Sequence, residues 1–214
     1  MQKLIIWGAG GHGKVVLDIA RSMGIFAEIV FVDDARISPG QTFCDCQLLP
    51  SSEGLKLLKA RGHGAFVVAI GDNSTRERCF RQGIEQGLEA TSLIHPSAII
   101  SDSVRIGGGT VVMPRVVVNA DTVIGDNCIL NTGAIVEHDC RIGNHVHLAP
   151  GVTLGGNVTV EKHSFLGIGT IVLPGAMIGA GAVLGAGAVV LNSAPAGTTS
   201  VGVPAKVLAK AKSR

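Results

Sequence analysis

His138 stands between two acidic residues, Glu137 and Asp139, and is the best candidate in the sequence for acid–base chemistry. A carboxylate beside an imidazole can hold it in one tautomer and make it more basic, as a general base near neutral pH requires. Gly156 follows eighteen residues later, and we expect it to leave room there for a ligand. Because exposed histidines are common, the alternative is a solvated histidine whose neighbours only satisfy its charge.

A second group of residues could bind a phosphate. Gly8, Gly10 and Gly13 have the spacing G-x-G-x-x-G after a short apolar run, and Asp33 ends the next apolar run. Such a turn brings backbone N–H groups at a helix N-terminus close to a diphosphate, and an acidic residue in that place contacts ribose. The pattern favours a nucleotide diphosphate with the phosphates near Gly10, Gly11 and His12, and with ribose or base near Asp33 and Asp34.

This turn has three other interpretations. The same residues fit a P-loop, but Val15 stands where that loop needs Ser or Thr for magnesium, so an ATPase is disfavoured. NAD binding is weakened because about ninety residues supply only half of a full dinucleotide fold. The glycines could also serve only a tight strand-to-helix turn.

His145 and His163 are the other histidines that spacing brings together. They are eighteen residues apart and therefore stack in one column of the repeat described next. A metal ion between such histidines is conceivable, but the sequence indicates no third ligand. We therefore expect no metal.

An aliphatic residue occurs at every sixth position from Ile94 to Val190, with a small or β-branched residue four positions after each. Neither a helix nor a flat strand has this period, whereas a coil with six residues on each of three sides does. Residues eighteen apart then stack, and Cys128 and Cys140 point inward. The register predicts a parallel β-helix over residues 93–194, followed by a tail at 195–214.

Residues 1–92 have a different texture. Buried strands are expected at 4–7, 29–32 and 65–70, and helices at 14–20 and 74–87, the second capped by Asn73 or Ser74. Alternating apolar strands and helices indicate a small parallel sheet. This α/β unit, a half-Rossmann domain, is the one that should bind the nucleotide.

Composition excludes several classes of protein. The net charge of +2 gives no reason to expect a nucleic acid partner. Residues 164–205 carry no charge, but their glycines fall at the corners of the repeat, so they form coil and no membrane insertion is expected. Five cysteines and an N-terminus that meets glycine too early for a signal peptide predict a cytoplasmic protein.

Five short motifs complete the pattern. They are IGDN at 70–73, IHPSA at 94–98, NTG at 131–133, EHDC at 137–140 and VGVPAK at 201–206. With the glycine-rich start, they resemble the sialic-acid O-acetyltransferase and bacillosamine-pathway family of sugar acetyltransferases over essentially the whole chain. The resemblance implies a left-handed β-helix, a homotrimer, acetyl-CoA as cosubstrate and a nucleotide-diphosphate amino sugar as acceptor.

The resemblance also implies roles for individual residues. His138 would be the general base, and Asp139 would raise its basicity. His147, Gly156 and Ile168 would contact acetyl-CoA. The nucleotide sugar would be held by Gly10, Gly11, His12, Asp33, Asp34 and Gly71. No long loop interrupts the register, so we expect a neighbouring subunit to form the other wall of the site.

The sequence therefore predicts an acetyltransferase that moves acetyl from acetyl-CoA to the amine of a nucleotide-linked amino sugar. O-acetylation of a sialic-acid-type hydroxyl uses the same parts and stays open. A zinc lyase or hydratase would need about three histidines around one ion. A non-catalytic nucleotide-sugar-binding module would leave the His138–Asp139 pair without a role.

Overall fold

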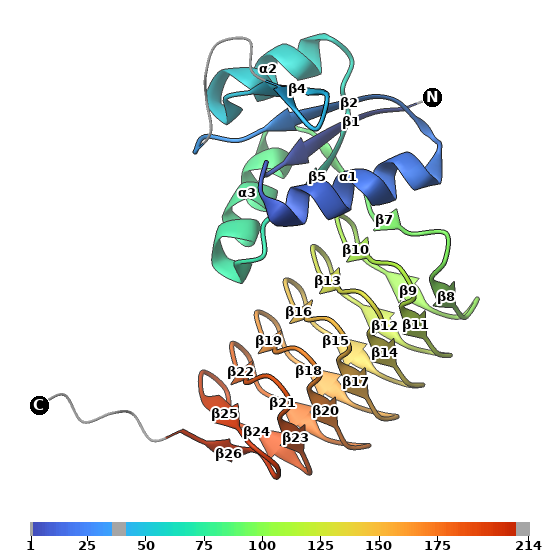
Figure 1. The fold of residues 1–214 in the computed structure, drawn as a ribbon, viewed down its shortest axis with the longest axis vertical. Coiled ribbons are helices and arrows are strands. Elements are labelled where there is room, and N and C mark those ends of the chain that lie inside the picture. The colour runs from blue at the N-terminus through green and yellow to red at the C-terminus, as the bar shows by residue number, and fades with distance from the viewer. Residues whose placement is uncertain (1, 36–41, 209–214) are drawn as a thin grey trace, which may run out of the picture.

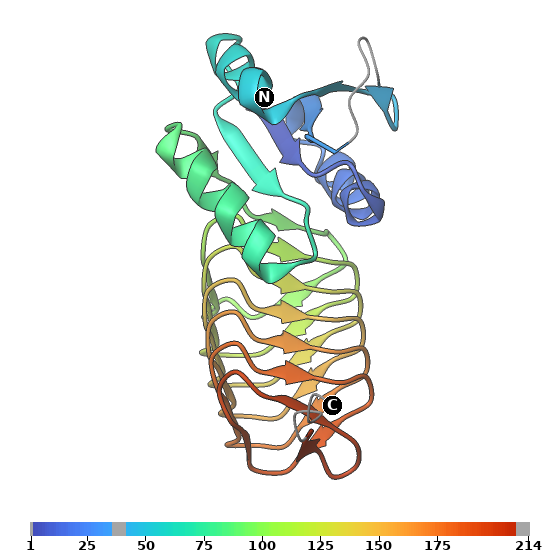
Figure 2. The same cartoon turned by 90° about the vertical axis from the view of Figure 1, so that its left-hand side faces the viewer.

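The protein is described here from a computed structural model, which covers residues 2–35 and 42–208. An α/β unit sits on one end of a long triangular coil, and helix α3 (Asn73–Glu85) runs down beside the first turns of that coil (Figures 1 and 2). Residues 209–214 of the predicted tail lie outside the described residues.

The N-terminal unit is a six-stranded sheet in the order β3-β4-β2-β1-β5-β6. Its pairs are parallel apart from the hairpin of β3 and β4. The strands are β1 (Gln2–Trp7), β2 (Phe26–Val32), β3 (Thr42–Phe43), β4 (Cys46–Leu49), β5 (Ala65–Val68) and β6 (Glu89–Ala90). Helix α1 (Gly11–Met23) packs on the face toward the coil, while α2 (Ser51–Ala60) and α3 pack on the other. The predicted α/β unit is confirmed.

Helix α2 was not predicted from the sequence, and the starts of the two predicted helices differ from the prediction. Helix α1 begins at Gly11, inside the glycine-rich run, since Lys14 N already donates to Gly10 O at 3.3 Å. Helix α3 is capped by Asp72, whose carboxylate accepts from Thr75 N at 2.8 Å, so the expected cap at Asn73 or Ser74 was wrong by one or two residues. Asn73 is free for a different role at the coil.

The predicted parallel β-helix is confirmed as three sheets of short strands that pair with strands eighteen residues away, except at the last turn, where the spacing is sixteen and the final strand pairs antiparallel. Sheet 1 contains β7 (Leu93–Ile94), β10 (Val111–Val112), β13 (Ile129–Leu130), β16 (His147–Leu148), β19 (Phe165–Leu166), β22 (Val183–Leu184), β25 (Thr199–Val201) and β26 (Lys206–Val207). Sheet 2 contains β8 (Ile99–Ile100), β11 (Val117–Val118), β14 (Ile135–Val136), β17 (Thr153–Leu154), β20 (Ile171–Val172) and β23 (Val189–Val190). Sheet 3 contains β9 (Arg105–Ile106), β12 (Val123–Ile124), β15 (Arg141–Ile142), β18 (Thr159–Val160), β21 (Met177–Ile178) and β24 (Ser193–Ala194).

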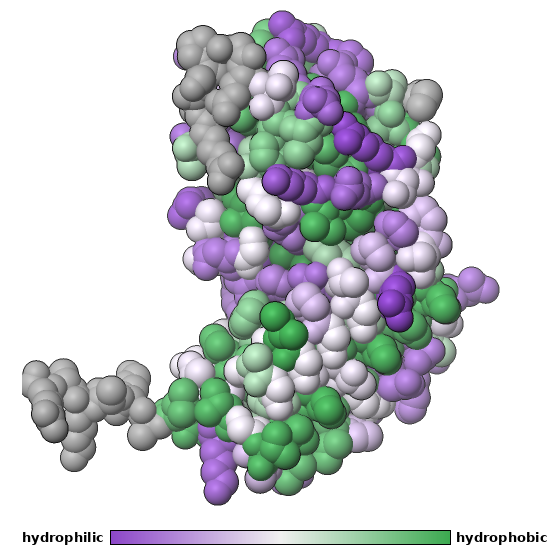
Figure 3. Space-filling view, viewed as in Figure 1, coloured by the Kyte–Doolittle hydropathy of each residue, from purple (hydrophilic) through white to green (hydrophobic). Residues whose placement is uncertain are grey.

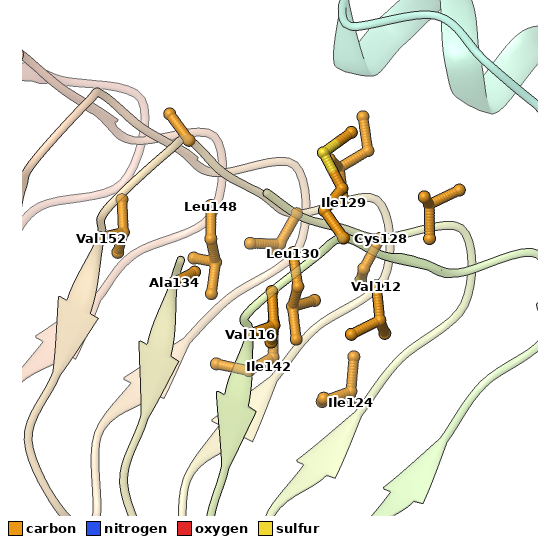
Figure 4. Packing of buried hydrophobic residues seen from close by; sticks show 14 of the residues in the cluster. Val112, Val116, Ile124, Cys128, Ile129, Leu130, Ala134, Ile142, Leu148 and Val152 are labelled. Carbon is orange, nitrogen blue, oxygen red and sulfur yellow. The ribbon is translucent and has the colours of Figure 1, made fainter. Parts of the chain in front are cut away.

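Every register residue from Val112 to Val190 is buried, and so are Cys128 and Cys140. Figure 4 shows part of this core, with Leu130, Ile142 and Leu148 of the register. Strand β25 pairs with β22, so the coil continues beyond residue 194 into the segment expected to be a tail. None of the helices in the described ranges is both long and apolar enough to cross a bilayer.

The corners of the coil impose a backbone requirement. From residue 109 to residue 187, every sixth residue has a positive φ in the left-handed region. Most of these corners are Gly, Asn or Asp, which tolerate that conformation, but Arg115, His145 and His163 also adopt it. The corners therefore present short turns on which a side chain such as Asp139 projects in a fixed direction.

The two parts share one core. Apolar residues of α1 pack into the same buried cluster as Leu93 of β7 and Val111 of β10. The α/β unit is thus fixed on the first turns of the coil, with the carboxyl ends of β1 and β5 near sheet 1. This arrangement places the candidate nucleotide-binding residues of the α/β unit close to sheet 1 of the coil.

Candidate active site

His138 lies on the corner between β14 and β15, where its side chain is 61% exposed. Its Nδ1 is 2.8 Å from Asp139 Oδ2. Hydrogen bonding to this carboxylate, with the negative charges of Asp139 and Glu137, raises the pKa of His138 above its usual value. Because an ionised carboxylate can only accept, the neutral ring carries its proton on Nδ1, and Nε2 keeps a lone pair for an incoming proton.

Gly156 lies against this imidazole. A Cβ at Gly156 would come within 2.6 Å of His138 Cε1 and Nε2. The glycine therefore makes room for the ring of His138 itself, not for a ligand as we expected. It is a packing requirement of the candidate base.

The glycines of the glycine-rich turn are of two kinds, crowded and open. A Cβ at Gly13 would lie 2.2 Å from Gly8 O, and a Cβ at Gly8 would lie 2.8 Å from Ala69 O, so these two allow close packing of strand and helix. A Cβ at Gly10 or Gly11 would meet nothing within 4 Å. The open space at these two positions is where a ligand could approach the backbone.

Asp33 and Asp34 both hold backbone in place. Asp33 accepts from Ala9 N and Ala35 N, each at 2.7 Å, which ties the glycine-rich turn to the end of β2. Asp34 accepts from the amide and hydroxyl of Ser51 at the start of α2. Their expected contacts with ribose or base would use the lone pairs that these bonds leave free.

His147 lies on sheet 1 beneath the α/β unit and is 9% exposed. Its Nδ1 is 3.2 Å from Gly71 O and its Nε2 is 3.3 Å from Asn131 Nδ2. Burial, then the charge of Arg76, lowers the pKa of His147 to about 4. Burial and the charges of His147 and Arg76 also lower the pKa of His12 to about 4, and His12 Nε2 is enclosed without a hydrogen-bond partner among the described residues. Both rings are neutral at pH 7, and His12 Nε2 is a polar atom that a ligand could satisfy.

Sequence reasoning missed Arg76, which holds this junction together. The side chain is fully buried, and burial lowers the pKa of the guanidinium to about 10, so it stays charged. It donates to backbone oxygens of both parts and to one side chain: Asn127 O at 2.9 Å, His145 O at 2.8 Å, Ile70 O at 3.2 Å, Gly71 O at 3.1 Å and Asn73 Oδ1 at 2.7 Å. A signal was present, since Arg76, Cys79 and Gly83 form the buried stripe of α3, where an arginine needs partners.

A hollow of about 510 Å³ opens between the start of α3 and sheet 1. Its wall includes Gly71, Asn73, His163 and Phe165. Asn73 crosses to the coil, donating through Nδ2 to His163 O at 2.9 Å and to Ser164 O at 3.1 Å. This hollow adjoins the predicted nucleotide-sugar residues through Gly71.

The predicted site residues thus form two separate groups within one chain. His138, Asp139 and Gly156 share one corner of the coil, whereas Gly71 and His147 meet under the glycine-rich turn. No hydrogen bond within residues 2–35 and 42–208 joins the groups. Ile168, expected on the acetyl-CoA with His147 and Gly156, is 61% exposed on the turn after β19. One chain therefore does not gather the three residues expected to contact acetyl-CoA.

Comparison with known proteins gives two family matches. The PglD N-terminal domain matches residues 3–82, and the bacterial transferase hexapeptide (six repeats) matches residues 121–156 and 157–192. UDP-N-acetylbacillosamine N-acetyltransferase of Bacillus subtilis is 36% identical over 114 residues, which are 53% of this chain and 52% of that one. The chain thus matches about half the length of this curated relative.

Two solved structures match nearly the whole chain. A histidine-to-alanine mutant of GDP-perosamine N-acetyl transferase from Caulobacter crescentus, in complex with CoA and GDP-perosamine, is 39% identical with a TM-score of 0.92, covering 98% of each chain. The acetyltransferase domain of PglB from Neisseria gonorrhoeae, in complex with acetyl coenzyme A, is 38% identical with a TM-score of 0.90, covering 97% of this chain and 99% of that one. These matches confirm the predicted order of an α/β unit and a left-handed β-helix. They also confirm the resemblance to the family of bacillosamine-pathway sugar acetyltransferases.

Proposed function

The chain belongs to the family of hexapeptide-repeat sugar N-acetyltransferases that carry a PglD-type N-terminal domain, and we propose that it transfers the acetyl group of acetyl-CoA to the amino group of a nucleotide-diphosphate amino sugar. The observation that carries this proposal is the His138–Asp139 pair, with Nδ1 bound at 2.8 Å and the ring 61% exposed. An exposed imidazole with a free Nε2 suits proton transfer from an incoming amine.

In the proposed reaction, the acceptor amine attacks the carbonyl carbon of the thioester. The C–N bond forms, the C–S bond breaks, and His138 Nε2 takes the proton that the amine loses. That proton can then pass to the departing sulfur, so CoA leaves as the thiol. A thioester is already activated, and a positioned base worth ~10²–10⁴-fold together with orientation of the substrates accounts for catalysis without a covalent intermediate.

The nucleotide sugar is proposed to bind at the α/β unit. Gly10 and Gly11 leave space at the N-terminus of α1, where backbone N–H groups attract a diphosphate. His12, whose Nε2 has no hydrogen-bond partner within residues 2–35 and 42–208, and Gly71, which contacts His147 of the coil, would continue the site toward the coil. His147 contacts Gly71 and not His138, so we assign His147 to the acceptor side of the site rather than to acetyl-CoA.

A complete site is proposed to need two chains. The base and the acceptor residues lie on different parts of one coil, so the sugar held by one chain would meet His138 of a neighbour. The outward residues of sheet 2 support such packing, because nearly all are aliphatic: Ile99, Val117, Ile135, Thr153, Ile171 and Val189. Ile99 is 68% exposed, and Figure 3 shows further apolar side chains gathered at the far end of the coil. We propose a homotrimer with the coils side by side.

The proposed activity is tested by acetyl-CoA consumption against a panel of nucleotide-linked amino sugars, with mass spectrometry of each product. The relatives are named N-acetyltransferases of perosamine and bacillosamine nucleotides, which favours N- over O-acetylation. An amide survives mild base and an acetate ester does not, so base treatment of the product separates the two. Transfer only to hydroxyl acceptors such as sialic acid, or a base-labile product, would refute the proposal. We propose that the enzyme works in the cytoplasm, where free cysteines such as those of this chain are ordinary.

A further inference from the structure

His145 and His163 form a histidine column on the edge of the coil that faces α3. Their rings stack with centroids 5.0 Å apart and an interplanar angle of 25°. Both residues adopt the left-handed conformation of the coil's corners, with φ of 61° and 63°. The sequence predicted this column.

The structure adds the third ligand that spacing could not show. Glu77 of α3 points its carboxylate at both rings, with Oε1 3.8 Å from His145 Nε2 and Oε2 3.6 Å from His163 Nε2. One ligand atom from each of the three residues lies within 4.8 Å of the others. Separations of 3.6–3.8 Å are too long for hydrogen bonds. They are close to the spacing of about 3.3–3.5 Å between ligands bonded to one tetrahedral zinc ion.

Both sides of His145 are consistent with a ligand role. Its ring is nearly buried, with Nε2 turned toward the carboxylate of Glu77. Its Nδ1 lies 2.9 Å from Asn127 Nδ2, and Asn127 Oδ1 is enclosed without a partner among the described residues. Half a turn of this amide would let Oδ1 accept from Nδ1–H, which leaves the lone pair on Nε2 facing Glu77.

We propose that Glu77, His145 and His163 bind a divalent transition-metal ion, zinc above all, which clamps α3 of the α/β unit to two successive turns of the coil. Two imidazoles and one carboxylate are ligands that zinc favours, and water would complete the coordination. Glu77 and His163 are about one-third exposed, so the ion can enter from solvent. The site borders the hollow lined by Asn73 and His163 and takes no part in the proton transfer by His138.

The competing interpretation is an ordinary ion pair between Glu77 and a protonated histidine. An ion pair needs no metal and gives no reason for two rings to converge on one carboxylate. The two interpretations make different predictions for the effect of zinc on Tm and for the visible spectrum of the Co²⁺-loaded protein. The test can therefore be made on the full chain without any assay of acetyl transfer.

The experiment measures zinc binding by competition with a chromophoric chelator, together with the visible spectrum of the Co²⁺-loaded protein and Tm with and without added Zn²⁺. Glu77→Gln and His163→Gln remove one ligand each at partly exposed positions, so both variants should fold. Glu85→Gln removes a carboxylate from the same helix, outside the cluster, as the matched control. We expect one zinc per chain in the wild type and the control, and binding at least roughly 10-fold weaker in either ligand variant.

Zinc should also raise Tm of the wild type by roughly 5–10 °C at a free concentration about a hundredfold above Kd, and Co²⁺ should give the intense visible bands of a low-coordinate site. The ligand variants should lose both responses. Wild-type protein that binds no zinc in the micromolar range would overturn the proposal. Equal affinity in wild type, Glu77→Gln and His163→Gln would overturn it as well.

Discussion

Replacement of His147 by asparagine should make the protein less sensitive to acid. The folded pKa of His147 is about 4, because the ring is buried beside Arg76, against an ordinary value of 6.5. A lowered folded pKa means that the unfolded chain binds the proton first. Stability is therefore fully present above pH 6.5 and is lost as the pH falls toward 4. The proton costs about 2 kcal/mol of unfolding free energy at pH 5, and about 3 kcal/mol below pH 4.

The assay is urea unfolding at pH 7.5 and pH 5.0, followed by circular dichroism. Asparagine can still donate to Gly71 O from about the position of Nδ1, so His147→Asn should fold and lose about 2 kcal/mol less than wild type between the two pH values. Phe165→Leu is the control, because the Phe165 ring packs on His147 with centroids 5.1 Å apart and carries no titrating group. It should lower stability equally at both pH values. An identical acid-induced loss in wild type and His147→Asn would refute the reasoning.

Three further predictions concern glycine, arginine and the shared site. Gly10→Val should raise the acceptor KM at least tenfold and leave both the KM for acetyl-CoA and Tm unchanged, as measured by steady-state kinetics and thermal scans. Gly13→Ala should instead lower Tm, because of these two positions only Gly13 has backbone, at 2.2 Å, where the Cβ would lie. A fall in Tm for Gly10→Val would contradict this prediction. Arg76→Met should lower the free energy of unfolding, measured in urea, by about 3–5 kcal/mol, since it leaves buried carbonyls unpaired. A change below about 1 kcal/mol would contradict the role of Arg76 in holding the α/β unit to the coil. Mixed trimers refolded from equal amounts of His138→Ala and Gly10→Val chains should regain roughly a quarter of wild-type activity at low acceptor concentration, and no recovery would place the whole site in one chain.

Much of the fold could be predicted because its determinants are local. The hexad register repeats without interruption, so it identifies which residues face inward, including Cys128 and Cys140. Strands β1, β2 and β5 and helices α1 and α3 of the α/β unit follow from apolar runs and turn residues, whereas helix α2 and the edge strands β3, β4 and β6 were not predicted. His138 could be placed on an exposed corner because the register fixes its position two residues after inward Val136.

The remaining features depend on contacts between distant segments. Glu77 meets His145 across 68 positions of sequence, and Arg76 meets the oxygen of the same residue across 69. Spacing within the coil says nothing about which helix of the α/β unit lies beside it. The same limit applies to His147, whose partner Gly71 belongs to the other domain. The spacing pairs Gly156 with His138, but only the structure shows that the imidazole fills the space.

The most direct test of the central claim is the pH profile of acetyl transfer by wild type and His138→Ala. The hydrogen bond and charge of Asp139 raise the pKa of His138, and a base acts only when unprotonated. For the wild type, kcat/KM should therefore rise with pH through a midpoint above 6.5, the ordinary histidine value. In His138→Ala that limb should vanish and kcat should fall ~10²–10⁴-fold with KM for acetyl-CoA nearly unchanged. Wild-type turnover and an unchanged profile in His138→Ala would contradict the account and move the base elsewhere.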